Sequence, residues 1–451
     1  MSQVVQIERI VDEQRLGWFN VALLGWCFLA MVSDGYEISA LASAVPELAR
    51  SWNIAPTQFK LALSASNFGV LLGAPLLGYI GDRYGRRIAI VAGCVLFGIG
   101  TFATLLVTDL PQLVAIRALT GIGIGGLMPN TIALNSELSP PRWRATLVVL
   151  MFTGITTGSG APGLIQSWLV PDYGWRIIFW IGGIAPLVIA AILWKALPES
   201  LNFLARRSDR REELLATARR MRPDLAIADN VQFVVAPAPP AEGAGLKQIY
   251  SGGLAIITPL LWACFITTLM TNFFLNQWLP TILVQNGWSQ QQSGIATSLY
   301  HYGGTAGGIL ISLILARLGF AAIALLFLFA VPAIAAIGFP NESFAMMSAM
   351  SAAAGFCVLG VQFGNNALSG LLYPAEVRSR GVGWALGVGR FGSIIGPYFG
   401  GYLIGLNLGM QTLFRLVALP MIVGLVAAIA LVVLGKRRFG GLHIDDKPTS
   451  G

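Results

Sequence analysis

The sequence predicts an all-α integral membrane protein in which twelve transmembrane helices form two pseudo-symmetric six-helix bundles. Of its 451 residues, 55% are hydrophobic and 11% are charged, and the mean hydropathy is +0.70. Soluble domains carry roughly 25% charged residues, so this chain has too little charge to cover a water-exposed surface. Its apolar segments have the length that a helix needs to cross a bilayer, and its two halves repeat one another.

The predicted helices follow one another along the chain with short connections, apart from one long polar interval in the middle. The first six span residues 18–45, 60–81, 88–107, 112–134, 146–170 and 175–196. The last six span residues 256–283, 293–316, 320–338, 344–371, 382–405 and 412–434. The first span is too long for the hydrophobic region of a signal peptide, so we expect it to remain as a helix.

The polar interval separates the two bundles. Its charged part (Arg206–Asp224) could form a surface helix, and "VVAPAPPAEGAG" (Val234–Gly245) has the composition of a flexible linker. The predicted domains are an N-terminal bundle, a cytoplasmic linker, a C-terminal bundle and a cytoplasmic tail, at residues 1–196, 197–255, 256–436 and 437–451.

Short matches between the two halves indicate an internal duplication. "NFGVLLGA" (Asn67–Ala74) matches "HYGGTAGG" (His301–Gly308), and Glu137 matches Glu376. The matches occur in the same order, with a slowly drifting offset. Repeats of this kind are typical of transporters whose two bundles move around a site near the bilayer midplane.

The net charge of +8 could suggest a nucleic-acid partner, but its distribution argues against one. Most of the 29 lysines and arginines lie at the N-terminus, in loops after even-numbered helices and at the C-terminus. By the positive-inside rule, both termini then face the cytoplasm of a bacterial-type inner membrane. The exceptions lie on the outer side or inside spans: Arg50, Lys60, Arg176, Arg415, Arg117 and Arg390. The four cysteines fall in spans without metal-ligand spacing, and we expect no metal site.

The segment "GYIGDRYGRR" (Gly78–Arg87) occupies the predicted cytoplasmic turn between helices two and three. Asp82 can face the N-terminus of a neighbouring helix, where the helix dipole favours an anion. Such a bond would hold the cytoplasmic side closed in one state and break in the other. Ala316 stands at the equivalent position of the second half, so only one half carries this latch. For Arg86 and Arg87 alone, a basic turn that follows charge topology is the simpler alternative.

This loop resembles the signature of the major facilitator superfamily between helices two and three. "RALTGIGIGG" (Arg117–Gly126) and "PESLNFL" (Pro198–Leu204) resemble its motifs in helix four and after helix six. "SELSPPRWRA" (Ser136–Ala145) and "PAEVRSRG" (Pro374–Gly381) resemble its loops after helices four and ten. The resemblance covers nearly the whole chain. It implies a conformational gate formed by Gly78, Asp82, Arg83, Gly85, Arg86, Arg87, Glu137, Arg144, Glu376 and Arg380.

The motif "DGYE" (Asp34–Glu37) is similar to the D-G-[FY]-D motif of the aromatic acid:proton symporter family within that superfamily. This chain has Glu37 where the family usually has Asp, which keeps the carboxyl group on a longer arm. The resemblance implies uptake of anions such as benzoate, hydroxybenzoates or protocatechuate by alternating access. Protons would be the coupling ion, and no other cofactor is implied.

Asp34 and Glu37 are the acids that lie well inside a predicted span, where an ionised carboxylate is costly. Asp34 lies about 24 Å along its helix from Trp18, at a depth where it could pair with Arg117. Inward movement of an anion opposes an inside-negative potential, and one co-transported proton cancels that charge. Because an apolar environment favours the protonated carboxyl, Asp34 or Glu37 could carry the proton. A purely structural ion pair is the alternative.

A substrate carboxylate in a dry cavity needs a cation, and a guanidinium offers a two-pronged match. Arg117, His301 and Arg390 are the candidates. Arg117 could instead join helices, Arg390 could extend to the cytoplasmic surface, and His301 could be a packing residue. Further candidates, which could equally form hydrogen bonds between helices, are Asn67, Phe68, Asn272, Asn276, Gln277, Tyr300, Tyr302, Gln362, Asn366 and Trp384.

Alternative functions remain open within and beyond transport. The chain could move another organic acid, or act as an exporter, because "GSIIGPYFGG" (Gly392–Gly401) resembles a motif of exchangers. An enzyme would need a nucleophile–base set, a metal cluster or a phosphate-binding loop, and the sequence offers none. A sensor or scaffold is disfavoured because no sizeable soluble domain is evident. We therefore expect a monomeric transporter whose partners are a small aromatic carboxylate, protons and the lipid bilayer.

Overall fold

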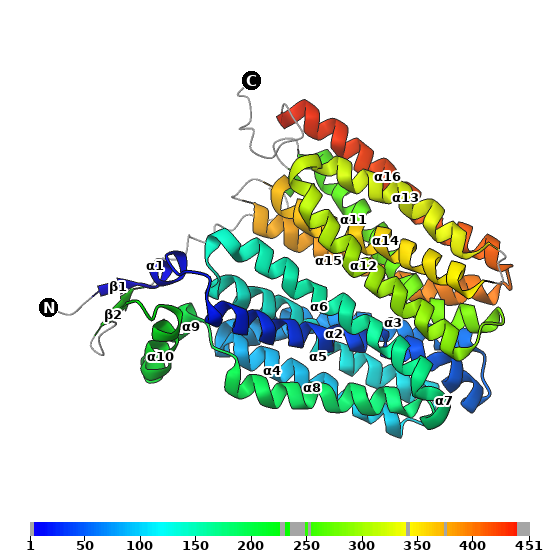
Figure 1. Cartoon of the computed structure of the whole chain (residues 1–451), viewed down its shortest axis with the longest axis horizontal. Coiled ribbons are helices and arrows are strands. Elements are labelled where there is room, and N and C mark those ends of the chain that lie inside the picture. The colour runs from blue at the N-terminus through cyan, green and yellow to red at the C-terminus, as the bar shows by residue number, and fades with distance from the viewer. Residues whose placement is uncertain are drawn as a thin grey trace.

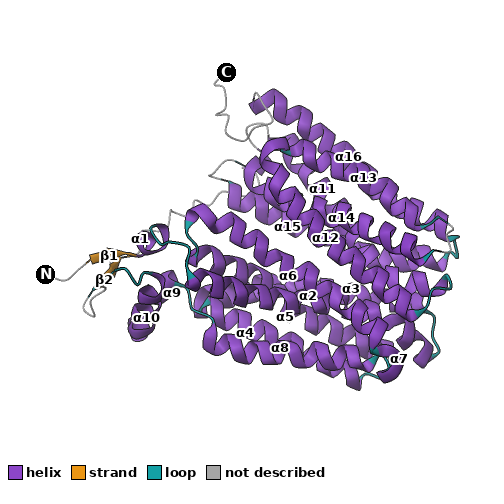
Figure 2. Cartoon of the chain, viewed as in Figure 1, coloured by secondary structure: helices purple, strands orange, loops and turns teal. Residues whose placement is uncertain are grey.

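A computed structural model of the chain describes residues 4–225, 231–234, 249–250, 254–339, 343–373 and 377–439. This part is almost entirely helical (Figure 2). Its long helices, one for each predicted span, are α2 (Trp18–Trp52), α3 (Lys60–Tyr84), α4 (Arg86–Ala103), α5 (Leu110–Leu138), α6 (Pro141–Trp168), α8 (Arg176–Ala196), α11 (Leu254–Gln285), α12 (Gln290–Leu318), α13 (Phe320–Ile337), α14 (Phe344–Leu372), α15 (Arg378–Gly405) and α16 (Met410–Phe439).

Short elements connect and flank these helices. They are β1 (Val4–Gln6), α1 (Ile7–Asp12), η1 (Pro56–Phe59), η2 (Thr104–Leu106), α7 (Val170–Tyr173), α9 (Leu201–Ala205), η3 (Ser208–Arg210), α10 (Arg211–Met221) and β2 (Gln232–Val234). The helix α10 lies within the charged segment for which a surface helix is predicted. Beyond Val234, the segment with linker composition lies outside the described residues.

Nine helices of the described chain are long and apolar enough to cross a membrane, and α12, α13 and α15 pack among them. Several helices extend beyond their predicted ends. The prediction that the first span ends at residue 45 is wrong, because α2 continues through Pro46 to Trp52. A proline is tolerated inside a membrane helix because neighbouring helices and side chains satisfy the backbone groups that it frees.

The packing of the helices repeats from one half of the chain to the other. In the first half, α2 packs on α6, α3 on α5, and α4 on both α5 and α8. In the second half, α11 packs on α15, α12 on α14, and α13 on both α14 and α16. Each packing contact of the first half has an equivalent contact in the second half, so the two bundles share one architecture (Figure 1).

The two ends of the molecule differ. The end that carries α1, α9 and α10 is called the basic end, and the opposite end, which carries α7, the distal end (Figure 1). Many hydrogen bonds join the bundles in their distal half or middle. They include Gln277 with Ile38, Ser64 with Ile394, Asn67 with Ser393, Thr156 with Thr305, Ser298 with Gly160, Ser167 with Gln291, and Gln166 with Gln290. These bonds close the molecule toward its distal end.

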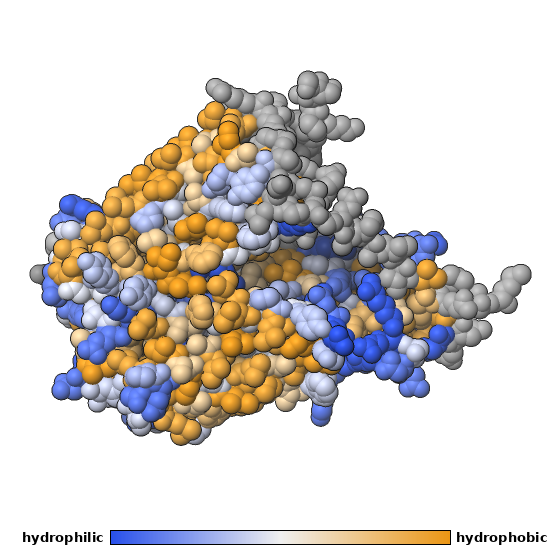
Figure 3. Space-filling view, turned by 180° about the vertical axis from the view of Figure 1, so that it is seen from behind, coloured by the Kyte–Doolittle hydropathy of each residue, from blue (hydrophilic) through white to orange (hydrophobic). Residues whose placement is uncertain are grey.

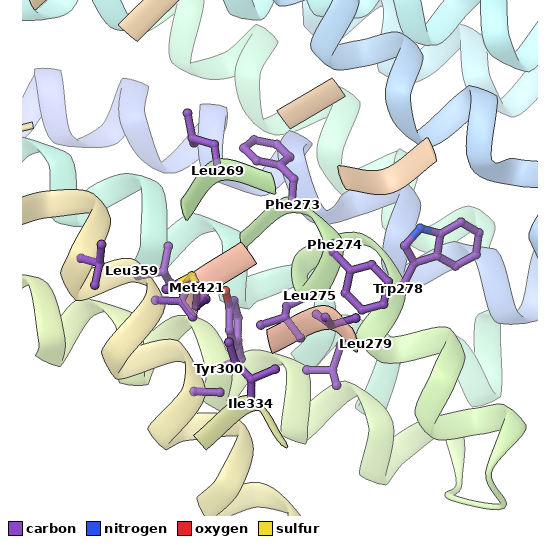
Figure 4. Packing of buried hydrophobic residues seen from close by; sticks show 14 of the residues in the cluster. Leu269, Phe273, Phe274, Leu275, Trp278, Leu279, Tyr300, Ile334, Leu359 and Met421 are labelled. Carbon is purple, nitrogen blue, oxygen red and sulfur yellow. The ribbon is translucent and has the colours of Figure 1, made fainter. Parts of the chain in front are cut away.

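The distal part of α11 is buried on all sides, because every residue from Thr271 to Leu283 is buried. Leu275 of this helix lies beside Tyr300 of α12, whereas Phe274 and Trp278 lie on its other side (Figure 4). The Trp278 indole nitrogen donates a hydrogen bond at 2.8 Å to the backbone carbonyl of Pro397 on α15. This bond satisfies the polar group of a fully buried ring. On the outside, hydrophobic side chains cover the bundles between more hydrophilic ends (Figure 3).

Candidate functional site

A cavity of about 120 Å³ lies between the two bundles, with walls from both. The polar residues that line it are Asp34, Asn67, Thr156, Ser159, Asn272, Asn276, His301, Gln362, Asn366 and Arg390. The apolar residues that line it are Ile38, Val70, Ile124, Met128, Phe152, Ile155, Leu269, Phe273, Leu359, Phe363 and Leu386. The cavity therefore combines aromatic and aliphatic walls with a few polar groups, as small-molecule sites commonly do.

Asp34 and Arg390 face this cavity from opposite bundles. Asp34 lies on α2 and is only 3% exposed, and its Oδ1 atom has no hydrogen-bond partner among the described residues. Arg390 lies on α15, where its guanidinium reaches Met128 Sδ at 3.8 Å. Neither forms an ion pair within the described chain, although their charges interact. An acid and a base are thus held apart across one cavity.

The backbone around Asp34 is shaped by close helix packing. Gly35 faces the backbone of Ile155 on α6, and Gly158 faces the backbone of Val32 on α2. An added Cβ at either glycine would collide with the facing helix, so the two glycines allow α2 and α6 to approach closely. This contact fixes the direction of the neighbouring Asp34 side chain.

His301 forms the centre of a small polar cluster at the cavity. Asn276 Nδ2 lies 3.1 Å from His301 Nε2 and donates to Ser39 Oγ at 2.9 Å. With the amide in this orientation, Asn276 Nδ2 is the donor and His301 Nε2 the acceptor of this bond. Ser39 belongs to α2, whereas Asn276 and His301 belong to α11 and α12, so the cluster connects the two bundles.

Amide side chains line the second-bundle wall. Asn272 Nδ2 donates to Gln362 Oε1 at 3.3 Å, and Asn272 Oδ1 accepts from the Tyr300 hydroxyl at 2.9 Å. The Oδ1 atoms of Asn276 and Asn366 have no donor among the described residues. Buried acceptors without partners are costly, so these atoms suit a ligand that brings hydrogen-bond donors.

Glu37 and Arg117 lie away from the cavity and pair with each other. The expected pair of Asp34 with Arg117 is wrong, because Arg117 forms a salt bridge with Glu37 inside the N-terminal bundle. Thr101 Oγ1 donates to the same carboxylate at 2.8 Å, and Arg117 Nη2 donates to the Glu37 backbone carbonyl at 3.3 Å. Neither Glu37 nor Arg117 is among the residues that line the cavity, so neither contacts a ligand there in this structure.

Five further side chains predicted for the site lie outside the cavity lining. Phe68 and Trp384 project outward, with exposures of 50% and 43%, and Trp384 stacks on Trp262. Tyr302 packs against Gly160 between α6 and α12. The other two are Tyr300, fully buried behind Asn272, and Gln277, bonded to the Ile38 carbonyl. Aromatic rings in a membrane protein can face lipid as well as the interior, so composition alone did not separate these cases.

At the basic end, the predicted gate residues form a network around Arg86. Its guanidinium contacts Asp82 at 2.6 Å and Glu137 at 3.6 Å, and donates to Asn130 Oδ1 at 3.2 Å. Asp82 therefore contacts Arg86 rather than the N-terminus of a neighbouring helix in this structure. Arg87 forms a salt bridge with Glu213 of α10 at 2.9 Å, which ties the linker helix to the first bundle.

The helix N-terminus at this gate is occupied by Glu199, which sequence reasoning did not single out. Its carboxylate accepts hydrogen bonds from the backbone N–H groups of Arg86, Arg87 and Ser200, at 2.9, 3.2 and 2.9 Å. Burial raises the pKa of Glu199, while these bonds favour its ionised form. Gly85, at φ 113°, lets this acid approach, because an added Cβ would collide with the carboxylate. The resemblance of "PESLNFL" (Pro198–Leu204) to a motif of the superfamily is the sequence signal that could have pointed to Glu199.

The other residues predicted for the gate make separate contacts. Arg83 donates to the Tyr79 hydroxyl at 3.0 Å, and Gly78 faces open space. Arg144 donates to the Ser139 carbonyl at 3.4 Å, whereas Glu137 accepts from Ser200 Oγ. Arg380 lies in the first turn of α15, and Glu376 lies outside the described residues.

Two pseudo-symmetric bundles around a central cavity with buried charges define a membrane transporter. The Major Facilitator Superfamily model matches residues 27–322 and 261–446, and the chain belongs to this superfamily, within its aromatic acid transporter family. It is 31% identical to a gallate transporter of Pseudomonas putida, over 96% of each chain. It is 32% identical to the 4-hydroxybenzoate transporter PcaK of Acinetobacter baylyi, over 94% of this chain and 93% of that protein.

A solved structure supports the fold. The xylose transporter XylE of E. coli, in a partially occluded inward open conformation, superposes with a TM-score of 0.68 at 14% identity. The match covers 92% of this chain and 98% of that chain.

Proposed function

We propose that this protein imports small aromatic carboxylates together with protons by alternating access. The observation that carries the proposal is the pair of Asp34 and Arg390, an acid and a base without ion-pair partners in the described chain, on opposite bundles of one cavity. The names of the gallate and 4-hydroxybenzoate transporters support an aromatic acid as the substrate. In this proposal Arg390 binds the substrate carboxylate and Asp34 carries the proton.

Coupling follows from competition between two anions for one cation. While Asp34 is ionised, its negative charge offsets part of the positive charge of Arg390. A proton on Asp34 removes this competition, and Arg390 is then free to hold the substrate carboxylate with charge-assisted hydrogen bonds. Substrate and proton therefore favour each other's binding. The loaded cavity carries no extra net charge, so its movement does not oppose the membrane potential.

The rest of the cavity fits an aromatic ring. Phe152, Phe273 and Phe363 offer ring contacts from three helices. The unpartnered amide oxygens of Asn276 and Asn366 could accept hydrogen bonds from ring hydroxyl groups, which donate one proton each. His301, held by Asn276, then shapes the cavity wall rather than binding the carboxylate.

The orientation and setting of the transporter complete the proposal. The basic end carries the clustered arginines and would face the cytoplasm of the inner membrane, by the positive-inside rule. Because the described hydrogen bonds between bundles lie toward the distal end, this arrangement corresponds to an inward-facing state. We propose a monomer that uses no cofactor other than the proton and catalyses no chemical reaction.

Transport by the purified protein tests this function. Proteoliposomes that contain only this chain are given an inward proton gradient, and uptake of labelled 4-hydroxybenzoate, gallate and benzoate is measured against non-aromatic acids such as succinate. We expect accumulation of at least one aromatic acid, abolished by a protonophore. Flux of the non-aromatic acids alone, or aromatic flux indifferent to the proton gradient, would contradict the proposal.

A further inference from the structure

A groove at the basic end lies outside the transport cavity. It has a volume of about 870 Å³ and lies where the start of α2, the end of α8 and the end of α10 meet. Two of its walls belong to membrane helices and one to the linker. The groove therefore opens at the level where a helical bundle passes from membrane to water.

Three cationic side chains line this groove: Arg15, Lys195 and Arg220. All three are exposed, and none forms an ion pair within the described residues. The carboxylate of Asp224 also lines the groove, but Arg222 already binds it at 2.8 Å. Asp224 also interacts electrostatically with Arg15, but one carboxylate cannot offset three cations, so the groove presents a net positive charge.

Aromatic side chains form the membrane side of the same groove. Trp18, Phe19 and Trp26 line it, and Trp18 is 82% exposed at the first position of α2. Tryptophan prefers the boundary between lipid and water, where its ring contacts acyl chains and its N–H stays hydrated. A ligand in this groove would thus meet rings on its apolar side and cations on its polar side.

We infer that this groove binds the headgroup of an anionic phospholipid from the adjacent leaflet. The phosphate would lie among Arg15, Lys195 and Arg220, and the first acyl carbons would lie against Trp18 and Trp26. This inference goes beyond the proposed transport function and does not depend on which substrate moves. Because Arg220 belongs to α10, the bound lipid would connect the linker helix to the first bundle.

Native mass spectrometry of the full-length protein tests the site. Binding of the first phosphatidylglycerol is compared with that of phosphatidylcholine in the wild type and in Lys195→Gln/Arg220→Gln. Attraction to an anionic surface is worth about tenfold or less per basic residue, so we expect the double variant to lower the phosphatidylglycerol preference by about ten- to thirtyfold. Phosphatidylcholine binding should not change.

A matched control removes two other exposed cations at the basic end. Arg142→Gln/Arg206→Gln lies outside the groove and should keep the lipid preference. An equal loss in both double variants would show that general surface charge, and not this groove, attracts the lipid. Displacement of phosphatidylglycerol by millimolar inorganic phosphate would assign the groove to a free anion and overturn the lipid. A thermal unfolding curve for each variant shows whether it is folded. If the groove double variant does not fold, the single variant Arg15→Gln takes its place.

Discussion

Two carboxylates three residues apart on α2 have different surroundings. Asp34 faces the cavity without a hydrogen-bond partner for Oδ1, whereas Glu37 is held by Arg117 and Thr101 inside one bundle. A proton carrier must meet a change of environment during transport, and a residue enclosed within a single rigid bundle does not. Of the two predicted proton carriers, Asp34 is therefore the one that we retain in the proposal.

Substitution of Asp34 by asparagine should abolish uphill transport. Asparagine keeps the size of the side chain but cannot bind and release a proton. We expect no accumulation of a labelled aromatic acid in vesicles with an imposed pH gradient, while exchange of substrate across the membrane persists. Wild-type accumulation by Asp34→Asn would remove this residue from the coupling mechanism.

Loss of the Arg390 guanidinium should weaken substrate binding. A hydrogen bond to a charged group contributes about 1.5–3 kcal/mol, so Arg390→Ala should raise the Kd by roughly ten- to a hundredfold. Arg390→Lys should restore binding only in part, because an ammonium lacks the planar fork. Titration calorimetry on the purified variants measures both values. Unchanged affinity in Arg390→Ala would show that another cation binds the substrate carboxylate.

At the scale of the helices, the number and order of elements followed from the sequence. Apolar length is a strong signal in a membrane, and all twelve long helices match a predicted span. The direction of a side chain is a weaker signal, because lipid and protein interior are both apolar. This is why the sequence did not show that Phe68 and Trp384 face outward, on helices that also line the cavity.

The glycine-rich stretch of α15 illustrates the same difference. Its resemblance to a motif of exchangers kept an exporter open as an alternative from sequence alone. In the structure, Gly392 and Gly396 face the backbone of Ile266 and Met270 on α11, where an added Cβ would collide. Close packing of the two helices accounts for these glycines, and the motif supplies no separate argument for export.

The Glu37–Arg117 pair should connect α2 and α5 rather than bind substrate. Removal of one member of a buried ion pair typically costs about 3–5 kcal/mol, because the other charge remains buried and unpaired. We expect Glu37→Gln to lower the melting temperature clearly, with little change in substrate affinity per folded molecule. In Glu37→Gln/Arg117→Met much of the stability should return. Wild-type stability together with lost proton coupling in Glu37→Gln would restore its role as a proton carrier.

Asp82, at the end of α3, should affect rate more than binding. Its carboxylate is 67% exposed and contacts Arg86, and exposed ion pairs contribute about 0–1 kcal/mol to stability. We expect Asp82→Asn to fold normally and to bind substrate, but to transport it more slowly. The variant loses the predicted bond of Asp82 to a helix N-terminus, which would hold the cytoplasmic side closed in the other state. Uptake rates and equilibrium binding on the same preparation separate these effects. A parallel loss of both would indicate a direct role in the site.

At the scale of the whole molecule, the two bundles meet through small residues at the distal end. Gly163 of α6 faces the Gly294 carbonyl and Ser298 of α12, and Gly294 in turn faces Gly163 and Ser167. An added Cβ at Gly163 would lie 2.6 Å from the Gly294 carbonyl oxygen, which is closer than real Cβ contacts occur. The closed distal side therefore requires a glycine at this position.

A larger residue at Gly163 should shift the transporter toward its other state. We expect Gly163→Val to separate α6 and α12 at the distal end and to slow transport. A cysteine introduced at Gln290 should then react faster with a membrane-impermeant thiol reagent from outside, since the four native cysteines are buried. Gly405→Val, at the distal end of α15, serves as the control, because an added Cβ there meets open space and the residue has no positive φ. Equal labelling rates in both variants would contradict the assigned state.

The parallel pairing of β1 with β2 affects how the chain is made. Val4 pairs with Gln232, so β1 must wait for a partner that is synthesised after the six long helices of the first bundle. That partner is available before α11 begins at Leu254. The first bundle can therefore be completed and closed at its basic end while the second bundle is still being translated. Biogenesis of this transporter can then proceed as two successive folding events rather than one.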